Sequence, residues 1–98
     1  MTDIVLLTTP QCSLCEHAKS VLEDLAADYQ LRVEYVELDS DWGRELAPAG
    51  TFPFPPGLLI DGQPAAYGRL SARRLRREFD TRDTPRRDPS TRPPGTRG

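Results

Sequence analysis

The chain contains two cysteines, Cys12 and Cys15, separated by two residues. A Cys-x-x-Cys pair can exchange disulfides or contribute to a metal site. Two cysteines are too few for the disulfide framework of a small secreted domain. A closed zinc site needs four ligands, and His17 is the only histidine. We therefore expect no metal site within one chain, although a site shared between chains stays open, and we expect redox chemistry at the cysteines.

The position of the pair assigns a role to each cysteine. A buried strand ends just before Cys12 and an amphipathic helix begins just after it, so the free amides and the dipole of the helix favour a Cys12 thiolate. Cys12 is the predicted nucleophile. Cys15, one turn further on, faces the same side and can resolve a mixed disulfide. No basic residue is close in sequence and Glu16 is near, so we expect modest thiolate activation; His17 points away from Cys15 and is not expected to act as a base.

Hydrophobic periodicity places the elements around this pair. A short apolar run predicts a buried strand, Thr9-Pro10-Gln11 interrupts it, and apolar residues at three- and four-residue steps predict the helix. An alternating run then predicts a second strand, so the first part is a right-handed β-α-β unit. The predicted elements of this unit are strand Ile4–Thr8, helix Ser13–Tyr29 and strand Leu31–Leu38.

The rest of the folded part is predicted from caps and turns. Ser40-Asp41 caps a short helix that reaches about Ala47, and a proline-rich loop follows. Asp-Gly favours a tight hairpin turn, and Pro64 places the second hairpin strand at a sheet edge. Ser71 caps a last helix on which Leu75 and Phe79 share one face. The hairpin strands are predicted at Leu58–Ile60 and Gln63–Tyr67.

Charge and composition divide the chain into two parts. With 98 residues there is room for one domain, and the apolar share of 37% is low. Residues 1–68 carry eleven acids and three bases, a formal charge of −8, whereas residues 69–98 carry ten arginines and four acids, a charge of +6. Residues 81–98 include no apolar residue and four prolines. We expect a folded domain at 1–80 and a disordered Arg/Pro-rich tail at 81–98.

Neither end of the chain indicates export or a membrane. An acid replaces the basic start of a signal peptide, and the first apolar run stops at Leu7. No stretch approaches the roughly 18 apolar residues that a membrane span needs. We expect a cytoplasmic monomer.

The motif and element order resemble the thioredoxin fold, and the nearest likeness is to small bacterial glutaredoxin-like proteins. Their pattern Leu-Thr-x-Pro-x-Cys-x-Leu-Cys is similar to Leu7-Thr8-Thr9-Pro10-Gln11-Cys12-Ser13-Leu14-Cys15, and the likeness covers roughly residues 3–80. It implies an α/β, thioredoxin-like fold of order β-α-β-α-β-β-α with a four-stranded mixed sheet. It also implies a small thiol–disulfide oxidoreductase that works by dithiol exchange.

The resemblance further implies a cis-proline opposite the cysteines. Counting back from Asp61 assigns this role to Pro56. Here the chain departs from the family, because the preceding residue normally pairs with substrate through its N–H and C=O, and Pro55 has no N–H. The alternative is a cis bond at Pro55, with Phe54 pairing. The substrate-binding residues expected on this basis are Pro10, Gln11, Phe54, Pro55, Pro56 and Arg69.

Glutathione is left open as the reductant. Typical glutaredoxins place a lysine before the cysteines and a Gly-Gly-x-x-Asp-like segment after the hairpin; Thr9 occupies the first position here, and residues 66–71 replace the second. Arg69 and the helix start at Ser71 could still hold an anion. No tightly bound cofactor is expected.

Two other classes of function compete with an oxidoreductase. One is a non-catalytic interaction or redox-sensing module that binds a partner through Phe52 and Phe54. The other is attachment to nucleic acid or an acidic protein through the arginines; nucleic acid is disfavoured because no aromatic residue lies among the tail arginines. For the oxidoreductase, the expected partners are a disulfide-containing protein or small thiol, with a reductase or glutathione as electron donor.

Overall fold

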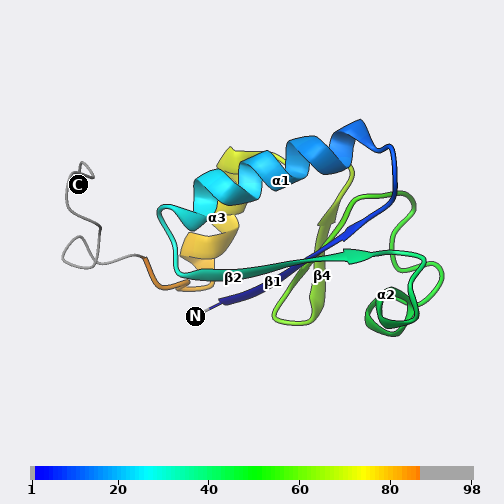
Figure 1. Ribbon diagram of the computed structural model, residues 1–98. Helices are drawn as coiled ribbons and strands as arrows, with labels where there is room; N and C mark the ends of the chain where they lie inside the picture. The colour runs from blue at the N-terminus through cyan, green and yellow to red at the C-terminus, as the bar shows by residue number, and fades with distance from the viewer. Residues whose placement is uncertain (1, 87–98) are drawn as a thin grey trace.

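A four-stranded sheet with helices on both faces forms the core of the protein (Figure 1). The structure is a computed structural model that describes residues 2–86. Its elements in chain order are β1 (Thr2–Thr8), α1 (Ser13–Ala26), β2 (Leu31–Glu37), α2 (Asp41–Leu46), β3 (Gly57–Ile60), β4 (Gln63–Tyr67) and α3 (Ala72–Thr81). This order confirms the predicted α/β architecture, and the bounds differ from those predicted by at most three residues for β1, α1, β2 and the hairpin.

The sheet is mixed and has the strand order β2-β1-β3-β4. Strand β1 is parallel to its neighbour β2 and antiparallel to its other neighbour β3. Strands β3 and β4 also pair antiparallel. One end of the sheet, which we name the cysteine end, is where β1, β2 and β4 finish and β3 begins. Its residues are Thr8, Glu37, Gly57 and Tyr67. Cys12 comes shortly after β1, which finishes at this end.

Helices α1 and α3 cover one face of the sheet, and α2 lies on the other (Figure 1). The buried side chains of α1 recur at helical spacing, as the sequence predicts. They join apolar residues of the sheet and of α3 in the main core. Leu22 and Phe79 are both fully buried there, so α1 and α3 are stabilised by one shared hydrophobic core.

Helix α2 is short and begins as predicted. The Ser40 hydroxyl accepts a hydrogen bond from the Gly43 N–H at 3.0 Å. Gly43 is buried, and a Cβ atom there would collide with the carbonyl of Glu37, so glycine permits α2 to approach the end of β2. A small second cluster of Leu7, Val36, Ala47 and Leu59 fills the space between α2 and the sheet.

The predicted hairpin is confirmed. Asp61 and Gly62 link β3 to β4, and both have positive φ, 50° and 83°. A two-residue turn of this kind needs positive φ at both positions, which Asp-Gly supplies at low cost. Pro64 lies in β4, the edge strand, as expected for a residue that cannot donate to a central ladder.

The structure differs from the sequence-based expectation just after residue 80. Thr81 closes α3, and residues 82–86 return to the start of β2 instead of leaving the domain. The Gln30 N–H donates to the Pro85 carbonyl at 2.8 Å, and the Arg86 guanidinium lies 4.7 Å from the centre of the Tyr29 ring. Hydrogen bonds and a cation–π contact thus order a segment without apolar residues. The remainder of the predicted tail, 87–98, lies outside the described residues.

Candidate active site

The loop between β1 and α1 delivers Cys12 to the start of the helix. Pro10 and Gln11 are exposed, and Gln11 takes a left-handed conformation with φ of 54°. This turn brings the chain back so that Cys12, in extended conformation, becomes the N-cap of α1. Pro10 and Gln11 therefore flank the reactive residue and are open to a partner molecule.

Cys12 caps the helix with its sulfur. Its Sγ accepts a hydrogen bond from the Cys15 N–H at 3.1 Å, as a serine oxygen would at this position. The helix amides and the positive end of the helix dipole therefore stabilise negative charge on this sulfur. In the reduced protein the same contact would favour the Cys12 thiolate.

Cys12 and Cys15 form a disulfide in the structure, and their Cα atoms are 5.2 Å apart. The two residues differ in access: Cys12 is half-buried, whereas Cys15 is 1% exposed. An incoming thiolate can therefore reach the bond at the Cys12 sulfur and not at Cys15. The roles of nucleophile for Cys12 and resolving thiol for Cys15 stay predictions.

The segment just before β3, which contains Pro55 and Pro56, also lies at the cysteine end. Leu7 pairs with Gly57, so Pro56 lies beside the last residue of β1. The Pro55–Pro56 peptide bond is cis, the isomer that the family resemblance implies for Pro56. The Pro56 carbonyl accepts a hydrogen bond from the Gly68 N–H at 2.8 Å, which ties this segment to the end of β4.

Two exposed aromatic side chains lie together next to this segment. The rings of Phe54 and Tyr67 meet edge to face, with centroids 5.3 Å apart, and about half of each side chain is exposed. Gly68 has φ of 70°, and a Cβ atom there would press on the Phe54 ring. Phe54 is among the binding residues expected from the sequence, whereas Tyr67 is not. Its place at the end of β4, opposite Gly57, is the signal that could have found it.

Arg69 follows this aromatic pair and is exposed. It lines a groove of about 700 Å³ between β4, the start of α3 and the loop before β3. Tyr67 and Arg74 line the same groove. The structure thus places Arg69 beside Tyr67 and the α3 N-terminus, directly after Gly68, whose N–H donates to the Pro56 carbonyl.

The remaining polar groups near the cysteines are Glu16, Lys19 and His17. The Glu16 carboxylate lies 3.3 Å from Lys19 Nζ. The Nδ1 atom of His17 is buried and has no hydrogen-bond partner among residues 2–86. In the same part of the chain, no three His, Cys, Asp or Glu side chains gather as metal ligands would.

These features define a thioredoxin-type fold with a Cys-x-x-Cys disulfide at the start of its first helix. Comparison with known families matches residues 3–80 to the glutaredoxin-like domain (DUF836), and the chain belongs to this family. No curated protein matches the chain. Within the described residues, none of the helices has the length and apolar character to span a bilayer.

Proposed function

We propose that the protein is a thiol–disulfide oxidoreductase that reduces disulfides by dithiol exchange. One observation carries the proposal. A half-buried cysteine caps a helix and is joined to a buried cysteine one turn later, which is the arrangement that a nucleophile and a resolving thiol require. Membership of the glutaredoxin-like family supports the same activity.

The proposed reaction has two exchange steps. The Cys12 thiolate attacks one sulfur of a substrate disulfide, a mixed disulfide forms, and the other substrate sulfur leaves as a thiolate that takes a proton from solvent. The Cys15 thiolate then attacks the Cys12 sulfur, and the second substrate thiol is released. The substrate gains two electrons and two protons, and the Cys12–Cys15 disulfide is restored. A thiol or dithiol reductant returns the two electrons in the next cycle.

We propose that the substrate contacts the Pro55 segment and the Phe54–Tyr67 pair. Pro55 can accept a hydrogen bond through its carbonyl but cannot donate one, because proline has no N–H. One half of the backbone pairing that a substrate strand would make is therefore missing. The exposed rings of Phe54 and Tyr67 offer apolar contact in its place, and Pro10 and Gln11 border the sulfur from the other side.

Turnover of a small neutral disulfide, 2-hydroxyethyl disulfide, tests the proposal. We expect the wild type to reduce it and Cys12→Ser to have no activity above background. Cys15→Ser should accumulate a mixed disulfide on Cys12, visible as an added mass that dithiothreitol removes. Ser20→Ala, an exposed change on the same helix, is the matched control. Equal activity in wild type and Cys12→Ser would overturn the proposal.

The same assay distinguishes the electron donors. One reaction contains glutathione with glutathione reductase, and the other contains a thioredoxin reductase with its own reductant. Because the two glutathione-binding positions of typical glutaredoxins differ here, we propose that the reductase system is the faster donor. A faster reaction with glutathione would assign that role to the tripeptide instead.

A further inference from the structure

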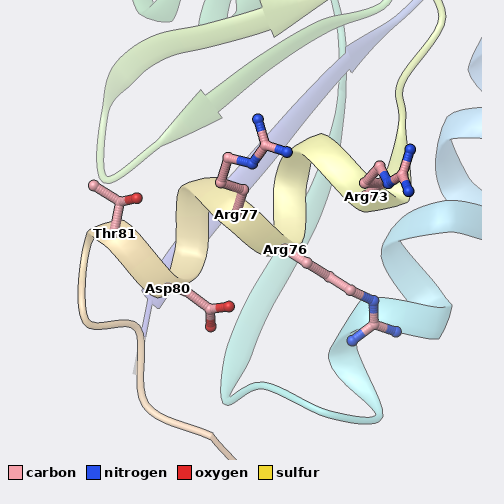
Figure 2. A pocket seen from close by; sticks show the side chains of 5 residues that line it. All are labelled: Arg73, Arg76, Arg77, Asp80 and Thr81. Atoms are coloured by element: carbon pink, nitrogen blue, oxygen red, sulfur yellow. The ribbon is translucent and has the colours of Figure 1, made fainter.

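The first two turns of α3 carry three arginines that form no ion pair within residues 2–86, and we name them the arginine face: Arg73, Arg74 and Arg77. All three are exposed. Residues 69–77 contain five arginines and no acidic residue. Arg73 and Arg77 border an open surface depression of about 660 Å³ together with Arg76, Asp80 and Thr81 (Figure 2).

The neighbouring Arg76, unlike the arginine face, has an acidic partner. Arg76 extends toward the end of α1, where it lies 2.8 Å from Asp28 (Figure 2). The carboxylates of α3 are engaged elsewhere: Glu78 pairs with Arg82, and Asp80 pairs with Arg86. Within residues 2–86, no acidic side chain forms an ion pair with Arg73, Arg74 or Arg77.

Folding does not account for this arrangement of charge. Arg73 and Arg74 lie in the first turn of α3, where the helix dipole disfavours cations, and that turn contains no acid. Arg73 and Arg77 are four residues apart on one side of the helix and repel each other. The arginines therefore lower the stability of the helix that carries them. A cost of this kind indicates a role in binding.

The position of the arginine face connects it to the cysteines. Strand β4 finishes at Tyr67, opposite Gly57, and Gly57 pairs with Leu7 near the end of β1. Helix α3 starts four residues after β4, so its arginine-rich turns begin at the cysteine end of the sheet and its acidic last turn lies farther along. Residues 1–68 carry a charge of −8, whereas α3 contains four arginines and two acids, so this helix is a positive element beside an acidic remainder.

We infer that the arginine face docks an acidic segment of a disulfide-bearing protein and so brings the disulfide of that protein to Cys12. The inference rests on the proposed oxidoreductase function. Complementary charge steers encounter and fixes orientation, and carboxylates match guanidinium groups. An acidic polypeptide fits better than nucleic acid: no aromatic side chain lies among the three arginines, and the acidic remainder of the domain would repel a phosphate chain that extends beyond the face.

Two matched peptides test the inference. Each contains one disulfide, flanked by glutamates in the acidic peptide and by glutamines in the neutral one, and kcat/KM is measured for both. At an ionic strength of about 0.01 M, we expect wild type to prefer the acidic peptide about tenfold, an effect of the size that electrostatic steering produces. Arg73→Gln/Arg77→Gln should reduce the preference to near unity, and Arg73→Lys/Arg77→Lys should retain it.

Arg32→Gln/Arg44→Gln is the matched control, because it removes the same number of charges from exposed positions outside α3. We expect it to keep the preference of the wild type. An equal loss in both double variants would overturn the inference, since net charge would then explain the effect. Absence of any preference in the wild type would overturn it as well.

A binding measurement separates this inference from the proposed function. The Cys12→Ser/Cys15→Ser variant is titrated with a fluorescent acidic peptide that lacks cysteine, and anisotropy is recorded. Binding that weakens with salt and with Arg73→Gln/Arg77→Gln supports docking even if no disulfide is turned over. Tighter binding of a single- or double-stranded oligonucleotide than of the acidic peptide would replace the acidic protein with nucleic acid and overturn the inference.

Discussion

Helices α1 and α3 begin at the same end of the sheet and pack on the same face, yet their first turns have opposite charge. Each has a side-chain cap: the Cys12 sulfur accepts from Cys15 N–H, and the Ser71 hydroxyl accepts from Arg74 N–H. The first turn of α1 contains Glu16, and that of α3 contains arginines. The comparison teaches that one local structure, a capped helix start, can hold a cysteine pair in one helix and exposed arginines in the other.

The far ends of the two helices are, by contrast, bonded to each other. The rings of Tyr29, just after α1, and Phe79 of α3 have centroids 5.2 Å apart. The Tyr29 hydroxyl donates to Asp80 at 3.0 Å and accepts from Arg86 at 3.0 Å. These contacts join α3 to α1 at the ends farthest from the cysteines, and the capped starts of both helices lie at the cysteine end.

The largest expected effect tests whether the two helices share one core. Phe79→Ala should lower the free energy of unfolding by about 3–5 kcal/mol, because a fully buried ring is lost and a cavity remains. Urea denaturation measures the loss. Phe54→Ala, which truncates a ring that is 52% exposed, is the control. If Phe79→Ala costs no more than Phe54→Ala, α3 is not held by the shared core.

A smaller effect is expected where the far ends meet. Tyr29→Phe removes two hydrogen bonds to half-exposed charged groups and should cost about 1 kcal/mol. Burial of the ring, followed by the hydrogen bond to Asp80, raises the pKa of Tyr29. The folded protein therefore holds this proton more tightly than the unfolded chain, so the stabilisation is complete below about pH 10 and is lost as pH rises through the raised pKa.

The difference between wild-type and Tyr29→Phe stability as a function of pH isolates this contribution, because Tyr35, whose pKa burial also raises, is present in both proteins. An ordinary tyrosine has a pKa of about 10, so we compare the two stabilities from about pH 8 to 11. If their difference stays constant over this range, the Tyr29 hydroxyl titrates alike in the folded and unfolded states, which would contradict the prediction.

Reversing charge at the start of α3 should separate stability from docking. Arg74→Glu places glutamate three residues after the Ser71 cap, which creates a capping box and removes a cation from the positive end of the helix. We expect a gain of about 0.5–1 kcal/mol in thermal unfolding, with weaker binding of the acidic peptide. Arg77→Glu, the same reversal in mid-helix, should gain less. A loss of stability in Arg74→Glu would contradict the statement that the arginines destabilise α3.

The smallest effect concerns the start of α1. Glu16→Gln removes a negative charge one turn from Cys12 and should slightly favour the Cys12 thiolate, because a nearby like charge disfavours it. The pH profile of alkylation of the reduced protein measures it. Glu23→Gln, two turns further along, should leave the profile unchanged. A wild-type inflection below about pH 5 would show strong activation and contradict the modest activation that we expect.

Much of the fold was predictable because the signals were local. The periodicity of α1, the caps Ser40 and Ser71, and the Asp61-Gly62 turn each depend on a few neighbouring residues, and each lies where the sequence places it. The Cys12–Cys15 disulfide was equally accessible to prediction, because it follows from spacing and from one helix start.

Features that join distant segments were missed. Tyr67 lies against Phe54 only because β4 pairs with β3 in one particular register, with an irregularity between Leu58 and Leu59. Residues 82–86 looked like part of a tail because they contain nothing apolar. Their order depends on a carbonyl and a guanidinium meeting Gln30 and Tyr29 about 56 residues earlier, a separation over which composition carries no information.

The sequence by itself determined the element order, the Cys-x-x-Cys pair and the division into an acidic and a basic part. Each of these depends only on residue types and on short-range spacing. Only the tertiary structure decided which cysteine is accessible, which arginines are unpaired and which aromatic rings meet beside Pro56. These depend on burial and on contacts across the sheet, and both arise only when strands and helices from different parts of the chain pack around one core.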